Sequence, residues 1–203
     1  MIAIIDYGVG NLFSLQSSLS MIGAQAVVTG DADVIRASDR IILPGVGAFG
    51  DARKKLADAG LDRVILAEAE RGKPLLGICL GMQMLFDKSF EYGEHDGLGL
   101  ISGRVVPLAG RIPKTLKVPH IGLNALDLRK MEHPLMKYTK NGDCVYFVHS
   151  FYAENCEESI VATSEYGIDV TAAVAKDNVM GCQFHPEKSG RVGLEILKAF
   201  CEG

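Results

Sequence analysis

The first half of the chain alternates short apolar runs with segments of helical periodicity. The apolar runs, which predict buried strands, lie at residues 2–5, 26–28, 41–43 and 73–76. The helical segments, in which apolar residues recur at three- and four-residue spacing, lie at residues 11–22, 51–59 and 61–71. Strands that alternate with helices in this way predict an open parallel sheet with helices on both faces.

The second half has a different pattern, in which short strands follow one another without intervening helices. We expect these strands near residues 97–106, 120–124, 144–150, 159–163, 170–175 and 179–184. Val192, Ile196, Leu197 and Phe200 then form the apolar stripe of a C-terminal amphipathic helix. We therefore predict an α/β fold whose C-terminal half adds antiparallel strands to one mostly parallel central sheet.

Composition and charge exclude several classes of protein. A length of 203 residues with 48% hydrophobic and 23% charged residues suits a single globular domain over residues 1–203. The formal net charge of -4, without a basic run, argues against nucleic acid as a partner. No apolar stretch approaches the roughly 18 residues that a membrane span needs, and the N-terminus reads as a strand rather than a signal peptide.

The five cysteines, at positions 79, 144, 156, 182 and 201, are odd in number and show no C-x-x-C spacing. This pattern argues against a disulfide framework and against a zinc site, so we expect no metal. It favours a protein of the reducing cytoplasm.

Gly77-Ile78-Cys79-Leu80-Gly81 places a cysteine between a predicted strand and Met84-Leu85-Phe86, which continues with helical periodicity. The pattern matches the nucleophile elbow G-x-S-x-G with cysteine in place of serine. Glycine is required on both sides because side chains there would collide with neighbouring strands. The start of a helix favours a thiolate, and the N–H of Leu80 points to where an oxyanion would form. The alternative is an inert buried cysteine in an ordinary strand–turn–helix.

Two glycine-rich loops follow predicted strands. Tyr7-Gly8-Val9-Gly10-Asn11 contains a lone G-x-G, and the dinucleotide-binding pattern fails because position 13 is Phe. Pro44-Gly45-Val46-Gly47 opens a loop whose glycines allow the backbone to approach a ligand closely. An ordinary connecting loop is the alternative for the second segment.

His185 and Glu187 are candidates for the base and the orienting carboxylate that a cysteine nucleophile needs. His185 ends a β-type run, and in extended backbone residues two apart project to the same side, so Glu187 can reach its ring. Cys79 and His185 both follow predicted strands, which places them at the carboxyl edge of one sheet. Taken alone, His-Pro-Glu is also a common surface turn.

Two segments together, Gly77-Ile78-Cys79-Leu80-Gly81-Met82-Gln83 and Gln183-Phe184-His185-Pro186-Glu187, resemble those of class I glutamine amidotransferases. Within that class, the chain resembles the glutaminase subunits of imidazole glycerol phosphate synthase over its whole length. The segments that carry this narrower resemblance are 6–11, 44–47, 118–122, 146–150 and 187–190.

The resemblance implies hydrolysis of L-glutamine to glutamate and ammonia, with Cys79 as nucleophile, His185 as acid and base, and Glu187 as its orienter. It implies an oxyanion hole built from backbone N–H groups of Leu80, Val46 and Gly47. The implied glutamine contacts are Gly47, Gln83, His149, Ser150 and Phe151. Neither an organic cofactor nor a metal is implied.

The resemblance also implies a heterodimer with a cyclase subunit, a (β/α)8 barrel that consumes the ammonia. The implied interface residues are Asn11, Leu123 and Lys188. Leu123 departs from the family, which usually has Trp there. The alternatives are a glutaminase of anthranilate, aminodeoxychorismate or guanylate synthesis, which more often has His where this chain has Met82, and, from other classes, a binding subunit or a hydrolase of other amides or thioesters.

Overall fold

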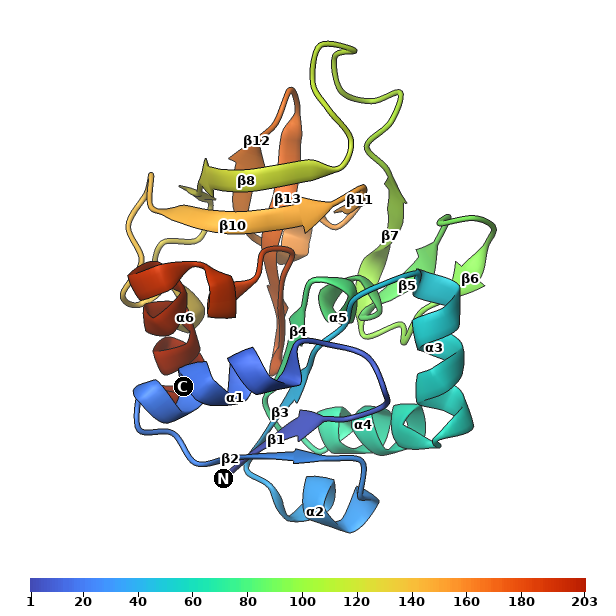
Figure 1. Ribbon diagram of the computed structural model, residues 1–203, viewed down its shortest axis with the longest axis vertical. Coiled ribbons are helices and arrows are strands. Elements are labelled where there is room, and N and C mark those ends of the chain that lie inside the picture. The colour runs from blue at the N-terminus through green and yellow to red at the C-terminus, as the bar shows by residue number, and fades with distance from the viewer.

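The computed structural model describes residues 1–203, and an eight-stranded sheet forms its centre (Figure 1). Five strands are mutually parallel: β1 (Ile2–Ile5), β2 (Ala26–Thr29), β3 (Arg40–Leu43), β4 (Leu75–Ile78) and β14 (Val179–Cys182). Three strands continue the sheet in antiparallel fashion: β13 (Asp169–Lys176), β12 (Ile160–Glu165) and β9 (Asp127–Leu128). The strand order is β2-β1-β3-β4-β14-β13-β12-β9, which confirms the predicted α/β class.

Helices cover both faces of the parallel strands, as the alternating pattern predicts. Successive strand residues point to opposite faces, so Ile4 packs with α1 (Leu12–Met21) and α6 (Gly190–Glu202). Ile5 faces the other layer, which contains α2 (Ala32–Ala37), α3 (Phe49–Asp58) and α4 (Leu61–Glu70). None of the helices has the length and apolar character that crossing a membrane demands.

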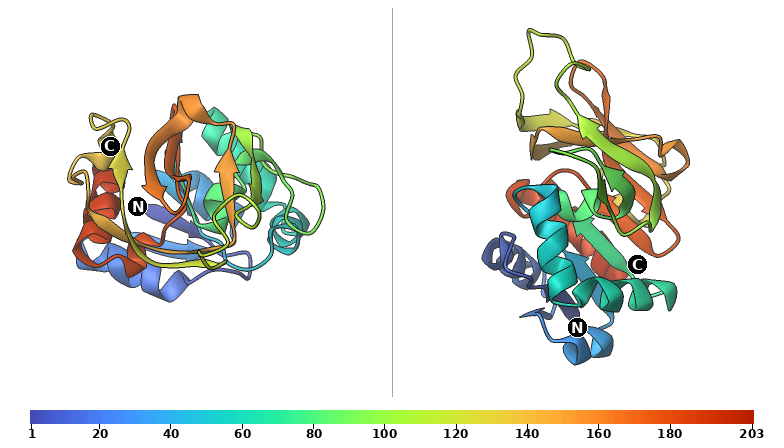
Figure 2. Two further views of the ribbon diagram at one scale, coloured as in Figure 1. Left: turned by 90° about the horizontal axis from the view of Figure 1, so that it is seen from above. Right: turned by 90° about the vertical axis from the view of Figure 1, so that its right-hand side faces the viewer.

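The remaining strands form two further sheets, so the expectation that all of them extend the central sheet is wrong. One sheet has the order β11-β7-β5-β6, and the other pairs β8 (His120–Ala125) with β10 (Cys144–His149). The bounds are β5 (Phe86–Ser89), β6 (His95–Asp96), β7 (Ile101–Pro107) and β11 (Phe151–Glu154). Figure 2 shows these β-rich layers beyond the parallel strands. The physical reason is burial: β13 is buried on both faces, whereas β8 and β10 alternate between buried and accessible positions.

Two local predictions also need correction. The helix α2 was not predicted, although Asp31 caps it by accepting hydrogen bonds from the N–H groups of Asp33 and Val34 at 2.7 and 3.2 Å. The helix after the elbow, α5, spans only Leu80–Gln83. Phe86 begins β5, which pairs with β7 in parallel, so strand pairing overrides the helical periodicity of this segment. Three single 3-10 turns complete the elements: η1 (Pro134–Met136), η2 (Glu157–Ser159) and η3 (Pro186–Lys188).

The carboxyl ends of β1, β3, β4 and β14 meet at one edge of the sheet, where open α/β folds place their sites. Ile78 of β4 lies opposite Cys182 of β14 in the parallel register. The next residue of each strand therefore leaves the sheet beside the other, and the N–H of Cys79 donates to the carbonyl of Cys182 at 2.8 Å. The fold thus brings two segments about 100 residues apart to one point.

Candidate active site

The elbow residue Cys79 has a backbone conformation that side chains rarely adopt. Its φ is 54° and its ψ is -112°, and the residue is buried, with 8% of its surface exposed. A Cβ on Gly77 would lie 2.7 Å from the carbonyl oxygen of Gly81, and a Cβ on Gly81 would lie 1.9 Å from that of Leu43. Space therefore requires glycine on both sides of the cysteine, as predicted, but at Gly77 the obstacle is the helix α5 that follows the elbow rather than a neighbouring strand.

His185 and Glu187 form a buried pair next to the thiol. The ring Nδ1 of His185 donates to Oε1 of Glu187 at 2.8 Å, and their side chains are 4% and 3% exposed. The backbone of His185 is fixed on both sides, because its N–H donates to the carbonyl of Tyr146 and its carbonyl accepts from the hydroxyl of Ser189. The predicted contact between His185 and Glu187 is therefore present, but a 3-10 turn over Pro186–Lys188 makes it rather than the extended backbone that was expected. Because both side chains are buried, the alternative of an exposed surface turn is wrong.

The electrostatics of the pair favour a charged imidazole. Burial lowers the pKa of His185, but the side-chain hydrogen bonds and negative charges of Cys79 and Glu187 outweigh burial and raise the pKa to about 9 from an ordinary 6.5. At neutral pH the ring is therefore protonated. It lies between a carboxylate on its Nδ1 side and the sulfur, so it holds a proton that it can give away.

The loop after β3 packs directly against the elbow. The hydroxyl of Tyr7 donates to the carbonyl of Pro44 at 2.7 Å, and burial, together with the nearby Cys79, raises the pKa of that tyrosine. A Cβ on Gly45 would lie 2.8 Å from the backbone N of Gly81, so glycine is required for this close approach. Gly47 has a φ of +92°, a conformation suited to glycine.

A cavity of about 390 Å³ opens at this edge of the sheet. Cys79, Leu80 and His185 line it together with Val46 and every predicted glutamine contact, namely Gly47, Gln83, His149, Ser150 and Phe151. Lys188 reaches its wall as well, whereas Glu187 lies behind His185. The structure therefore gathers residues from six separate parts of the chain around one thiol.

His149 holds the wall of this cavity in place. Burial lowers its pKa to about 4, so the ring is neutral, and its Nδ1 donates to the carbonyl of Phe151 at 2.8 Å. Its Nε2 lies 3.0 Å from Nδ1 of His120, whose ring is stacked between Phe147 and Tyr166. His149 therefore fixes the backbone carbonyl of Phe151 in the cavity wall and brings no charge to the cavity.

Glu91 is a cavity residue that the sequence did not reveal. It is the only acidic side chain in the cavity wall, and its Oε2 accepts from the N–H of Phe49 at 2.7 Å. Burial raises its pKa, while that hydrogen bond opposes the rise. A carboxylate at this position suits the ammonium group of an amino acid. The segment around Glu91 shows neither strand nor helix periodicity, so no pattern pointed to it.

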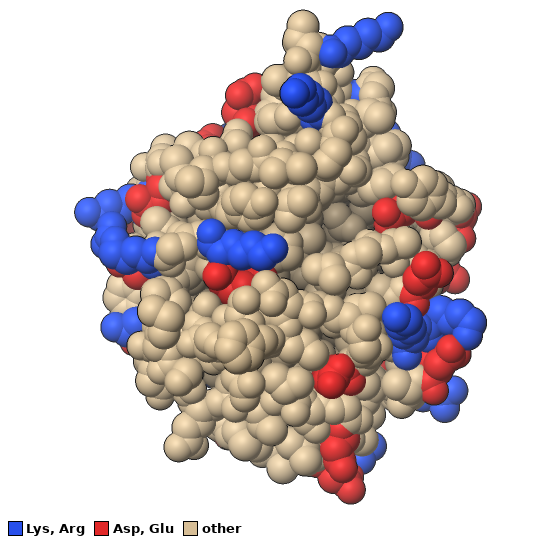
Figure 3. All heavy atoms as spheres, viewed as in Figure 1, with Lys and Arg blue, Asp and Glu red and all other residues tan.

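The three predicted interface residues lie on or directly beside elements that share one face, formed by α1, β8 and the segment before α6 (Figure 1). Leu123 of β8 is 65% exposed and pairs with Tyr146 of β10. The Nζ of Lys188 lies 5.8 Å from the ring centroid of Tyr146. Asn11, which precedes α1, lines a small cavity together with His185 and Glu187. Uncharged atoms cover most of the middle of this face (Figure 3).

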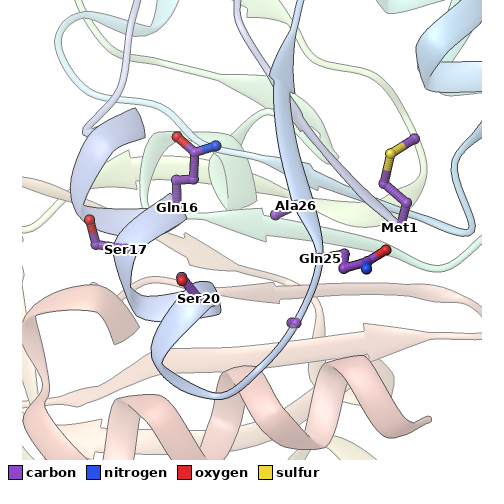
Figure 4. Close-up of a pocket in the computed structure, with 7 residues that line it drawn as sticks. Met1, Gln16, Ser17, Ser20, Gln25 and Ala26 are labelled. Carbon is purple, nitrogen blue, oxygen red and sulfur yellow. The ribbon is translucent and has the colours of Figure 1, made fainter.

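A second cavity, of about 580 Å³, lies between α1 and β2 (Figure 4). Its side chains include Gln16, Ser17, Ser20 and Gln25, with no carboxylate, imidazole or thiol. It therefore offers hydrogen bonds and two serine hydroxyls, but no side-chain acid or base that could activate a hydroxyl as a nucleophile. Elsewhere in the structure, no group of three or more His, Cys, Asp or Glu side chains is arranged to hold a metal ion.

Comparison with known proteins agrees with this geometry. The family model described as glutamine amidotransferase class-I matches residues 3–202. The imidazole glycerol phosphate synthase subunit HisH of Caldanaerobacter subterraneus subsp. tengcongensis is 52% identical over 203 residues, covering 100% of this chain and 98% of the relative. The same subunit of Methanosarcina acetivorans is 52% identical over 204 residues, covering 99% and 98%.

Solved structures that are more distant in sequence share the fold. The crystal structure of a glutamine amidotransferase superposes with a TM-score of 0.77 at 18% identity, covering 100% of this chain and 98% of that one. The structure of PurLQS from Thermotoga maritima gives a TM-score of 0.76 at 21% identity, covering 99% and 97%. The chain therefore belongs to the class-I glutamine amidotransferase family and, within it, to the imidazole glycerol phosphate synthase subunits HisH.

Proposed function

We propose that the chain, as a single domain of residues 1–203, hydrolyses L-glutamine through a thioester on Cys79 and supplies the ammonia to the cyclase subunit of imidazole glycerol phosphate synthase. The observation that carries the proposal is the strained elbow cysteine beside a buried imidazole–carboxylate pair, at the wall of a cavity of about 390 Å³. This is the arrangement that acyl transfer by a cysteine requires.

In the first half of the reaction, the thiolate of Cys79 attacks the side-chain amide carbon of glutamine, and the carbonyl oxygen becomes an oxyanion. The N–H of Leu80 stabilises that oxyanion together with N–H groups of Val46 and Gly47. Imidazolium at His185, favoured by its pKa of about 9, gives its proton to the leaving nitrogen. The C–N bond then breaks, so ammonia leaves and a thioester remains.

In the second half, the now neutral His185 takes a proton from water, and the resulting hydroxide attacks the thioester carbon. The C–S bond breaks, so Cys79 leaves as thiolate, with imidazolium beside it again, and glutamate is released. Glu187 keeps Nδ1 of His185 protonated in both halves, so Nε2 is the atom that exchanges the proton.

Glutamine is held by the rest of the cavity wall. Glu91 pairs with its α-ammonium, because it is the only carboxylate there. Gln83 gives both of its amide hydrogens to protein, to the carbonyl of Phe151 and to Oε1 of Gln183, so it presents only an oxygen to the substrate. Gly47, His149 and Ser150 complete the contacts from the backbone and the opposite wall.

The cyclase subunit docks on the face that carries Asn11, Leu123 and Lys188. An exposed apolar group there, formed by Leu123 at 65%, Ile121 at 58% and Val118 at 39% exposure, supports this proposal. Leu123 takes the place of the tryptophan that is usual in the family, so its aliphatic side chain supplies a smaller anchor than an indole.

The test is glutamate production by the purified complex with its cyclase subunit. Cys79→Ala should abolish it, while Cys144→Ala, which changes an exposed cysteine, should leave it unchanged. With ammonium salts supplied, the Cys79→Ala complex should still form the cyclase product, because only the ammonia source is lost. Glutamate formation by Cys79→Ala at the native rate would overturn the assignment.

A further inference from the structure

Gln183 occupies a position next to the nucleophile that the reaction described above does not use. It follows β14, is fully buried, and its Nε2 lies 3.7 Å from Sγ of Cys79. The adjacent strands explain the contact, because Cys182 and Ile78 are partners in the parallel register, and Gln183 and Cys79 are the next residues. A buried amide is costly unless its polar atoms are paired, so the orientation of this side chain is informative.

A chain of hydrogen bonds fixes which end of Gln183 faces the sulfur. The carbonyl of Phe151 can only accept, so the group of Gln83 that lies 3.1 Å from it must be the amide nitrogen. The same nitrogen lies 2.9 Å from Gln183, which must therefore present its oxygen there. The NH2 group of Gln183 is then the end that points at Cys79.

The same strand extension supplies the catalytic imidazole. Gln183 and His185 are two residues apart, and both reach Cys79, while Phe184 between them is buried in the core on the α1 and α6 side. The sulfur therefore has an amide donor 3.7 Å away, and the imidazole on the same strand extension is close enough for Cys79 to raise its pKa. Unlike the imidazole, the amide neither gains nor loses a proton. It therefore remains a hydrogen-bond donor throughout the reaction and favours the sulfur whenever the sulfur is negatively charged.

We propose that Gln183 is a positioning residue for the nucleophile: its amide N–H donates to Cys79 and favours the thiolate over the thiol. The proposal concerns the reactivity of the thiol and rests on the proposed function only where turnover is discussed. The amide of Gln183 stabilises the sulfur of Cys79 when the sulfur attacks and again when the sulfur leaves the thioester. These are the two steps in which the sulfur carries negative charge.

The decisive variant is Gln183→Met, which keeps the length of the side chain and removes the donor. Alkylation of Cys79 by iodoacetamide, followed by peptide mass spectrometry across a pH series, should be at least about tenfold slower at neutral pH, with its midpoint moved to higher pH. The exposed Cys144 in the same sample should react at the native rate and serves as an internal reference. The other titratable groups that face the sulfur, Tyr7, Cys182 and His185, with Glu187 behind it, are unchanged.

Turnover separates positioning from loss of structure. In the complex, Gln183→Met should lower kcat about tenfold with a smaller change in KM. Ser164→Ala removes a different buried donor, two strands away from β14, and should leave the alkylation profile unchanged. A raised KM with a native alkylation profile would mean that Gln183 only supports Gln83, and would overturn the proposal.

A measurement on the native chain decides the matter even if Gln183→Met does not fold. The side-chain amide signal of Gln183 in a 15N–1H spectrum should move when Cys79 is alkylated, while that of Gln16, on α1, should not. An unmoved signal would overturn the proposal. Because neither alkylation nor the spectrum uses glutamine, a complex that fails to hydrolyse glutamine would refute the proposed function and leave this test intact.

Discussion

Replacing Glu187 with glutamine should isolate the role of a single negative charge in the site. Oε1 of Glu187 accepts from Nδ1 of His185 at 2.8 Å, whereas its buried Oε2 has no protein donor in reach. Glutamine has the same size, so its oxygen can keep the bond to His185 while its nitrogen takes the place of Oε2. The change therefore removes charge without breaking a hydrogen bond within the protein.

The size of the effect follows from the pKa of His185. Despite burial, Cys79 and Glu187 raise that pKa to about 9 from 6.5, which corresponds to a preference for imidazolium of about 3 kcal/mol. Cys79 and Glu187 share this preference, and the side chains of His185 and Glu187 are almost inaccessible to screening water. Loss of the charge on Glu187 should therefore reduce the free-energy preference for imidazolium over neutral imidazole by about 1–2 kcal/mol, and should lower kcat roughly tenfold.

The assay is glutamate formation by the complex as a function of pH. His185 must be protonated to release ammonia, so activity falls as pH rises through its pKa, which is about 9 in the native protein. Lowering that pKa in Glu187→Gln should move the alkaline limb of the kcat profile to lower pH. KM for glutamine should change little, because Glu187 lies behind His185 rather than in the cavity wall.

Glu195→Gln is the matched control, since it makes the same chemical change where the carboxylate pairs with Arg191 on the surface of α6. It should leave the profile unchanged. If Glu187→Gln keeps the native alkaline limb and the native kcat, then the charge of Glu187 does not stabilise the imidazolium, and the reasoning is refuted.

Three further predictions follow from individual contacts. Glu91→Gln should raise KM for glutamine about tenfold with a smaller change in kcat, measured by steady-state kinetics, because it removes the only carboxylate of the cavity wall. Leu123→Ala should weaken binding of the cyclase subunit in calorimetric titration, by about 1 kcal/mol, whereas Met131→Ala, at a similarly exposed position (68% against 65%), should not. Gly81→Ala should destabilise the fold by about 3 kcal/mol in denaturant titration, since its Cβ would overlap the carbonyl of Leu43.

The sequence pointed to the three residues that we propose as catalytic because the signals for them are local. Cys79 is marked by flanking glycines, and His185 and Glu187 are marked by a separation of two residues after a predicted strand, although a 3-10 turn rather than extended backbone brings their side chains together. The ends of parallel strands meet at one edge, so two strand ends were enough to predict that Cys79 and His185 lie together. The register between β4 and β14, which determines the contact distance, is a tertiary property that no local pattern contains.

What the sequence did not predict depends on contacts between distant segments. Glu91 reaches the cavity from an irregular segment and is held by the N–H of Phe49, 42 residues away. Helix α2 is only six residues long, so its capping residue Asp31 was its main signal. The strand β5 carries helical periodicity but pairs with β7, because pairing in a sheet can outweigh the local preference of a four-residue segment.

The parallel pairing of β4 with β14 makes sheet register a requirement of the chemistry. Residues after β14 alternate, so Gln183 and His185 face the thiol while Phe184 fills the core. A slip of one residue would turn Phe184 toward Cys79 and bury an amide and an imidazole in the apolar core. The site therefore depends on the packing of Phe184 as firmly as on its polar residues. Because Phe184 is buried in the core, its two neighbours Gln183 and His185 are the residues that face the sulfur.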